Sequence, residues 1–106
     1  MSTYETIREK IIQALRKSNR PLTVDDLIMI LELNPSMKNQ LYNHIMHAAK
    51  SLRAKTRGRE EIVMIPPRCI KCGYTFIKLK RVKKPSKCPK CKSERIEPPS
   101  FMIRQT

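Results

Sequence analysis

The sequence predicts an α+β fold in which three helices precede an antiparallel strand pair that encloses a cysteine-containing segment. Three stretches in the first half of the chain carry apolar residues at helical spacing. Two short runs rich in apolar residues, at residues 60–65 and 101–103, read as strands and lie far apart in the sequence. All four cysteines lie between these runs, in two Cys-x-x-Cys pairs. The strands are therefore expected to pair with each other and pack on the helices, with the cysteine segment inserted between them.

The first helix is predicted from about Thr3 to Lys17, with Ser2 or Thr3 as its N-cap. Residues 18–21, which end in a proline, then break the helix. The apolar face that we expect in the core is formed by Tyr4, Ile7, Ile11 and Leu15.

The next two helices are expected to form a helix-turn-helix. Thr23 can cap the second helix, and Asp26 completes a capping box. A four-residue break at 33–36 follows, in which Pro35 stops one helix and Ser36 caps the next. The third helix is predicted from about Met37 to Arg53. The expected core stripes are Val24, Leu27, Ile28 and Leu31 in the second helix, and Met37, Leu41, Ile45, Ala48 and Leu52 in the third.

The opposite face of the third helix carries amides and bases. Asn39, Asn43 and Lys50 fall within about 40° of one another around the helix axis. Ordinary solvated faces usually mix Glu with Lys, whereas no acidic residue occurs in residues 37–58. Amides suit adenine, and cations suit guanine or phosphate. We therefore predict that this helix contacts nucleic acid through Ser36, Asn39, Gln40, Asn43, His47, Lys50 and Arg53.

The two cysteine pairs, separated by fifteen residues, predict a metal site. Two facing Cys-x-x-Cys loops complete a tetrahedron of thiolates, which structural zinc prefers. Disulfides would need an oxidising compartment, and the N-terminus shows no apolar signal core. A single iron would suit the same ligands, but no other motif indicates electron transfer. We predict one zinc per chain, with iron as the alternative, held by Cys69, Cys72, Cys88 and Cys91.

The segment around the cysteines is strongly basic. Residues 74–82 are expected to form a strand of a ribbon, and residues 83–87 to turn the chain back toward the second cysteine pair. No acidic residue occurs in residues 62–93. Such a basic block is either a solvent-exposed face without a partner or a surface that binds a polyanion. We favour the binding surface, because the block surrounds a folded metal site. The predicted nucleic-acid contacts here are Lys78, Lys80, Arg81, Lys83 and Lys84.

Overall composition narrows the class of protein. The 106 residues include 23 Lys and Arg against 9 Asp and Glu, a formal charge of +14, which suits a polyanionic partner. No apolar run approaches the length of a membrane span, so we expect a cytoplasmic protein without a membrane partner. We expect no enzyme, because there is no catalytic constellation and the two glycines, Gly58 and Gly73, cannot form a glycine-rich phosphate loop. A homodimer is compatible with a nucleic-acid-binding protein of this class, although the sequence shows no heptad repeat that would form a coiled-coil interface.

These motifs together resemble the archaeal family of predicted transcriptional regulators that fuse a winged helix-turn-helix to a rubredoxin-like zinc ribbon. The resemblance covers nearly the full length and is carried by residues 7–12, 22–52, 67–76 and 86–94. It implies that the ribbon takes the place of the usual wing. The expected division is a winged helix-turn-helix at 1–65, a zinc ribbon at 66–98, and a returning strand at 99–106.

The resemblance implies a transcription regulator that binds double-stranded DNA. The alternative is a zinc-ribbon module that binds RNA or docks on a ribonucleoprotein or polymerase complex. One position departs from the family pattern. Rubredoxin-like knuckles carry glycine after each second cysteine, which Gly73 satisfies and Lys92 does not. The second knuckle is therefore expected to be strained or to turn differently.

Overall fold

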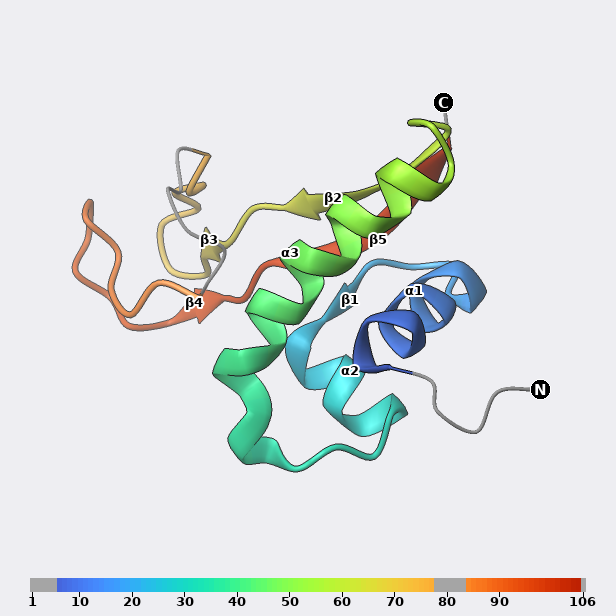
Figure 1. Cartoon of the computed structure of the whole chain (residues 1–106). Helices are drawn as coiled ribbons and strands as arrows, with labels where there is room; N and C mark the ends of the chain where they lie inside the picture. Colours follow the sequence, from blue (N-terminus) through green and yellow to red (C-terminus); the bar gives the residue numbers. More distant parts are fainter. Residues whose placement is uncertain (1–5, 78–83, 106) are drawn as a thin grey trace.

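A computed structural model describes residues 6–77 and 84–105. It shows three helices packed on a three-stranded antiparallel sheet, from one end of which a small ribbon projects (Figure 1). The predicted α+β class is confirmed. The elements in order are α1 (Ile7–Lys17), β1 (Leu22–Thr23), α2 (Val24–Ile30), the 3-10 helix η1 (Pro35–Met37), α3 (Lys38–Lys55), β2 (Glu60–Ile65), β3 (Arg68–Cys69), β4 (Ile96–Glu97) and β5 (Ser100–Gln105).

The N-capping residues determine where the helices α1 and α2 begin. The Thr6 side chain accepts a hydrogen bond from the Glu9 N–H at 3.2 Å, so α1 begins at Ile7. The predicted cap at Ser2 or Thr3 is wrong for this helix, and Tyr4 lies outside the described residues. The capping box of α2 is confirmed: Asp26 N–H donates to Thr23 Oγ1 at 3.1 Å, and Thr23 N–H donates to the Asp26 carboxylate at 3.0 Å.

The connection from α2 to α3 is longer than the predicted four-residue break. The helix α2 ends at Ile30, and Glu32 adopts a left-handed backbone with φ of 54°. The Leu33 N–H then donates to Ile28 O at 2.9 Å, which completes a Schellman motif. Asn34 caps the following 3-10 turn by accepting from the Ser36 N–H at 2.9 Å. The prediction of Ser36 as the cap is therefore wrong, and α3 begins at Lys38 without a side-chain cap.

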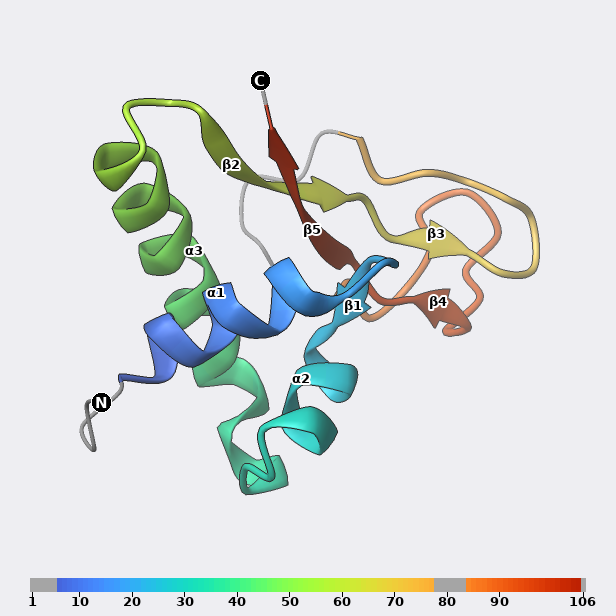
Figure 2. The ribbon, with the colours of Figure 1, turned by 90° about the vertical axis from the view of Figure 1, so that its right-hand side faces the viewer.

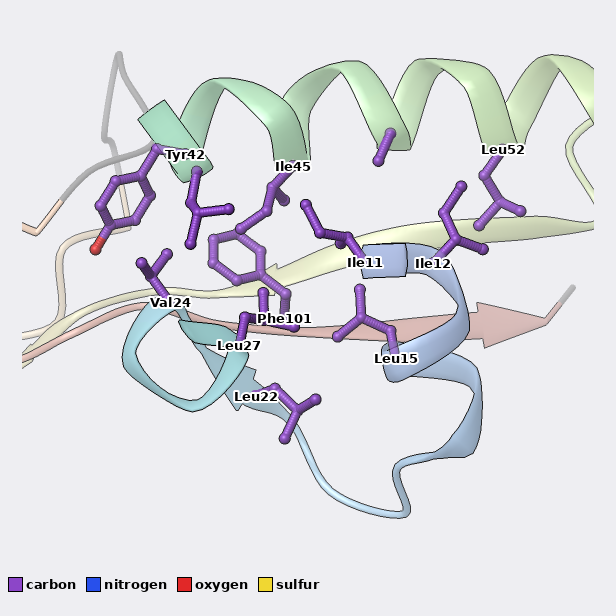
Figure 3. Close-up of a cluster of buried hydrophobic side chains, with 12 residues drawn as sticks. Ile11, Ile12, Leu15, Leu22, Val24, Leu27, Tyr42, Ile45, Leu52 and Phe101 are labelled. Atoms are coloured by element: carbon purple, nitrogen blue, oxygen red, sulfur yellow. The ribbon is translucent and has the colours of Figure 1, made fainter. Parts of the chain in front are cut away.

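The main core lies between the helices and the sheet (Figure 3). Most of the predicted stripe residues are buried there, whereas Ile7, Ile28, Leu31 and Met37 are half-buried. Tyr42 is a buried residue that the periodicity did not predict; its ring lies beside Val24. The buried members of this core are Ile11, Ile12, Leu15, Leu22, Val24, Leu27, Leu41, Tyr42, Ile45, Ala48, Leu52 and Phe101.

The sheet has the order β1-β5-β2, so the C-terminal strand β5 lies in its centre. The predicted antiparallel pairing of the two apolar runs is confirmed, with Val63 opposite Met102. The pair β3–β4 keeps the register of β2–β5: Ile65 faces Ser100 in one ladder, and Arg68 faces Glu97 in the next. Prolines occupy the positions between them, at 66–67 and 98–99. Since proline has no N–H to donate, a single long ladder is interrupted there, and the ribbon continues the hairpin of the sheet.

The predicted ribbon strand at 74–82 is not found in its described part, residues 74–77. There Thr75 forms an isolated bridge with Arg68, and β3 pairs with β4 instead. The Tyr74 carbonyl accepts from the Cys69 N–H at 2.7 Å, so this segment closes the first cysteine loop. Residues 78–82 lie outside the described part of the chain. Within the described ranges, no helix has the length and apolar character needed to cross a membrane.

Candidate metal centre and nucleic-acid interface

The two Cys-x-x-Cys segments fold into equivalent loops. In the first, Gly73 N–H donates to Cys69 O at 2.9 Å, and Cys69 N–H donates to Tyr74 O. In the second, Lys92 N–H donates to Cys88 O at 2.9 Å, and Cys88 N–H donates to Ser93 O at 2.9 Å. Each loop thus bends its backbone around the two sulfurs of its own pair. This is the knuckle arrangement that the spacing predicts.

The four sulfurs converge on one point. Cys69 Sγ lies 3.5 Å from Cys91 Sγ, Cys72 Sγ lies 3.6 Å from Cys88 Sγ, and all four lie within 4.8 Å of one another. A disulfide would bring two sulfurs to about 2.05 Å. Zinc–sulfur bonds of about 2.3 Å in a tetrahedron place sulfurs about 3.8 Å apart. The ligand set therefore fits one zinc ion, and the predicted metal residues are brought together.

Electrostatics favours a cation at this point. The backbone N–H of Cys72 is the main cause that lowers the pKa of the Cys69 thiol to about 6. For Cys72, the backbone N–H of Tyr74 acts to lower the pKa, but desolvation and the neighbouring sulfurs prevail and raise it to about 12. Four thiols this close cannot all ionise unless a positive charge offsets the repulsion between the thiolates. A divalent cation supplies that compensation and holds all four sulfurs in the thiolate form.

The ribbon has a core of its own, which the cysteines dominate. Cys69, Cys88 and Ile96 are buried, and Phe76 and Cys91 pack against them. This cluster is separate from the core of the helical body. So few apolar side chains cannot stabilise a fold alone, which gives the metal a structural role.

The predicted nucleic-acid residues of the helical body are all exposed. Asn39, Gln40, Asn43, His47, Lys50 and Arg53 lie on α3, and Ser36 lies in η1. In the ribbon, Lys84 is exposed. The other predicted contacts, Lys78, Lys80, Arg81 and Lys83, lie outside the described residues.

The structure also exposes apolar side chains that the sequence analysis did not single out. Met46 on α3 is 42% exposed. The signal that could have indicated this exposure is its spacing from Asn43 and Lys50, which places the three residues on one face of the helix. In the ribbon, Ile70 is 62% exposed and Ile77 is 77% exposed. Ile70 lies between the two cysteines of its knuckle, where a backbone wrapped around the metal turns side chains outward.

Comparisons with known proteins agree with this architecture. The family model described as PF0610-like, N-terminal, matches residues 6–62, and the model of the PF0610 rubredoxin-like zinc beta-ribbon domain matches residues 63–106. A search of curated proteins gave no match. The solution NMR structure of protein PF0610 from Pyrococcus furiosus is similar, with a TM-score of 0.66 and 26% sequence identity over 100% of this chain and 98% of that one.

The rubredoxin-like ribbon that the resemblance implied is thus confirmed, as is the likeness to an archaeal protein. One family model covers more than half of the chain, and the second covers its remaining C-terminal part. The chain therefore belongs to the PF0610-like family, in which an N-terminal domain is joined to a rubredoxin-like zinc ribbon.

Proposed function

We propose that this protein binds double-stranded DNA through the exposed face of α3 and regulates transcription, with zinc as a structural ion. The observation that carries this proposal is the composition of that face. Over Lys38–Lys55 there is no carboxylate, while Asn39 and Asn43 are exposed in the first turns, followed by Lys50 and Arg53. Such a helix offers hydrogen bonds to base edges at one end and positive charge to phosphates at the other.

The order of the elements supports a winged helix-turn-helix. The short strand β1 lies between α1 and α2 and pairs with β5, and β5 also pairs with β2. A winged domain has its flexible wing at the tip of this last hairpin, and here the ribbon occupies that tip. In this proposal, residues 1–65 and 99–106 form the DNA-reading body, and residues 66–98 form the ribbon.

The ribbon takes the place of a wing in the order of the elements, between β2 and β5. In Figure 1 it projects from the sheet on the side on which α3 begins, and in Figure 2 it extends away from α3. The described part of the ribbon exposes several cations and carries no acidic residue between its cysteines; these cations are Lys71, Lys84, Lys87 and Lys90. A wing contacts phosphates beside the groove that the helix reads. The zinc would keep these side chains in place without itself meeting DNA.

A second function is favoured by the apolar surface of the ribbon. Ile70 and Ile77 are exposed there, and Tyr74 meets Phe76 edge-on with ring centroids 5.0 Å apart. Exposed apolar and aromatic side chains among lysines suit unpaired RNA bases or a protein partner. In that case the ribbon would be a docking module for RNA or a transcription complex.

Selection of bound fragments from random duplex DNA, run in parallel with structured RNA, tests the proposal. We expect one family of duplexes to be enriched. Asn39→Ala or Asn43→Ala should then weaken the selected duplex by about 1–3 kcal/mol and leave binding to random DNA nearly unchanged. Asn19→Ala, at an exposed position outside α3, serves as the matched control. Enrichment of RNA alone, or an unchanged sequence preference in both α3 variants, would contradict the proposal.

A further inference from the structure

Met46 is an apolar side chain on a helix that otherwise hides its large apolar groups. Leu41, Tyr42, Ile45 and Leu52 of α3 are at most 6% exposed, whereas Met46 is 42% exposed. Packing within the chain therefore does not account for Met46. When a partner covers a large apolar side chain that is exposed to water, the free energy of the complex is lowered.

Its neighbours on the helix surface identify the kind of partner. Asn39, Asn43, Met46 and Lys50 are spaced four, three and four residues apart and fall within about 60° of arc on α3. Along the helix axis Met46 lies near the middle of this strip, with the two amides before it and the lysine after it. Around the axis it lies at one edge of the arc. Met46 thus lies at the flank of the α3 face that the proposed function assigns to DNA.

The major groove offers one apolar group, the C5-methyl of thymine. Resting on the proposed DNA-binding function, we propose that Met46 reads a thymine by packing its thioether side chain against that methyl group. An unbranched, polarizable side chain adapts well to such a contact. Asn43, one helical turn before Met46, can pair with an adenine through its amide. The two residues together select an A·T-containing step, and Lys50 anchors the adjoining phosphate or guanine.

The test removes the methyl group from the DNA and the thioether from the protein in turn. Each thymine of the selected duplex is replaced singly by uracil, which lacks the methyl and keeps every Watson–Crick hydrogen bond. Dissociation constants are measured by fluorescence anisotropy for the parent and for Met46→Ala. Alanine is the best helix former and the site is exposed, so α3 should keep its fold, which circular dichroism checks. Met46→Gln, with a polar side chain of similar length, is a second variant, and Met29→Ala, at a 76% exposed position on α2, is the control.

At one position, uracil should weaken binding of the parent and of Met29→Ala about three- to fivefold, which is the effect of losing one buried methyl contact. The same substitution should leave binding of Met46→Ala and Met46→Gln unchanged. If no position is sensitive to uracil, or if the loss is equal in Met46→Ala and the parent, the assignment of Met46 is overturned while DNA binding stands. If no duplex is selected at all, the proposed function fails, and the thymine contact fails with it.

Discussion

Gly73 and Lys92 occupy the same position in the two knuckles and share a left-handed backbone, with φ of 82° and 66°. Each donates its N–H to the first cysteine carbonyl of its own loop. The second knuckle therefore turns in the same way as the first. Of the two expectations for this knuckle, a different turn is wrong, and strain at Lys92 remains. Its lysine adopts the conformation that glycine adopts freely, at a cost of about 1–2 kcal/mol for an L-residue.

Relieving that strain should stabilise the zinc site. Lys92→Gly is expected to raise the free energy of unfolding of the zinc-bound ribbon by up to about 1 kcal/mol, because part of the gain is offset by the entropy of glycine in the unfolded chain. Gly73→Ala, at the equivalent position, should lower it by about 1–2 kcal/mol, although open space surrounds the added Cβ. Competition with a chromogenic chelator measures both. Lys90→Gly, at a position without a left-handed backbone, is the control; equal zinc retention in Lys90→Gly and Lys92→Gly would contradict the strain argument.

Removal of the metal should unfold the ribbon and spare the helices. Among the described residues, the ribbon core consists largely of the cysteines, whereas the helical core has twelve buried residues and no cysteine. Chelation, or the double substitution Cys69→Ser and Cys88→Ser, should abolish chemical-shift dispersion for the described ribbon residues. Helical ellipticity at 222 nm should remain. Loss of that signal together with the zinc would show that the two cores unfold as one unit.

The central strand β5 makes the helical body depend on the end of the chain. Phe101 is 2% exposed and faces Leu22 on one side and Met64 on the other. Phe101→Ala should lower the free energy of unfolding by about 3–5 kcal/mol, because it leaves a cavity in the main core. Met102→Ala, at the exposed next position, should change it by far less. Urea denaturation followed by circular dichroism compares the two; similar losses would mean that Phe101 is not a core residue.

The capping box makes stability depend on pH. The Thr23 N–H is the first cause that lowers the pKa of Asp26, and the Arg20 guanidinium acts in the same direction. Because the folded-state pKa lies below the unfolded value of about 4, Asp26 stabilises the fold above that pH and loses its contribution as the pH falls through the folded pKa. Urea midpoints of the parent and Asp26→Asn should therefore differ at pH 7 and converge below pH 4. If the two urea midpoints differ by the same amount at every pH in this range, the predicted contribution of the Asp26 carboxylate is contradicted.

Ribbon lysines that meet phosphates should affect affinity without affecting sequence preference. Lys84 and Lys87 are exposed beside the second knuckle. Lys84→Ala with Lys87→Ala should weaken all duplexes alike and flatten the slope of log affinity against log salt by about one to two. Lys83, expected to act with Lys84, lies outside the described residues. Lys10→Ala with Lys17→Ala on α1 is the charge-matched control, and an unchanged slope in the ribbon variant would favour the docking-module function.

The sequence predicted those features that depend on residue type at fixed spacing. The capping box at Thr23, the apolar stripe of α3 and the four-cysteine site are local patterns whose geometry the chain can satisfy in few ways. The helix ends were harder, because both α2 and α3 close with left-handed residues other than glycine. These are Glu32 and Arg57, and nothing in their side chains marks the position.

Tertiary packing explains the other differences. Tyr42 lies beside the predicted stripe of α3 and is buried because α2 places Val24 against its ring. The segment after Cys72 is rich in β-branched and aromatic residues, yet Tyr74 closes the knuckle and Ile77 points to solvent. Strand propensity is a weak guide where a metal site dictates the backbone.

The prolines between the sheet and the ribbon divide one hairpin into two cooperative units. A β-ladder transmits fraying from each hydrogen-bonded pair to the next, and at Pro66–Pro67 and Pro98–Pro99 there is no N–H on either strand to carry that coupling. Amide protons of β3 and β4 can therefore exchange through local openings that stop before Ile65 and Ser100. The proline rings meanwhile hold φ at about −65° in both strands, and Pro67 and Pro99 are fully buried, so the direction of the ribbon is restrained by both ring geometry and packing. We therefore expect the ribbon to be able to lose and regain its metal while the sheet beneath it stays folded.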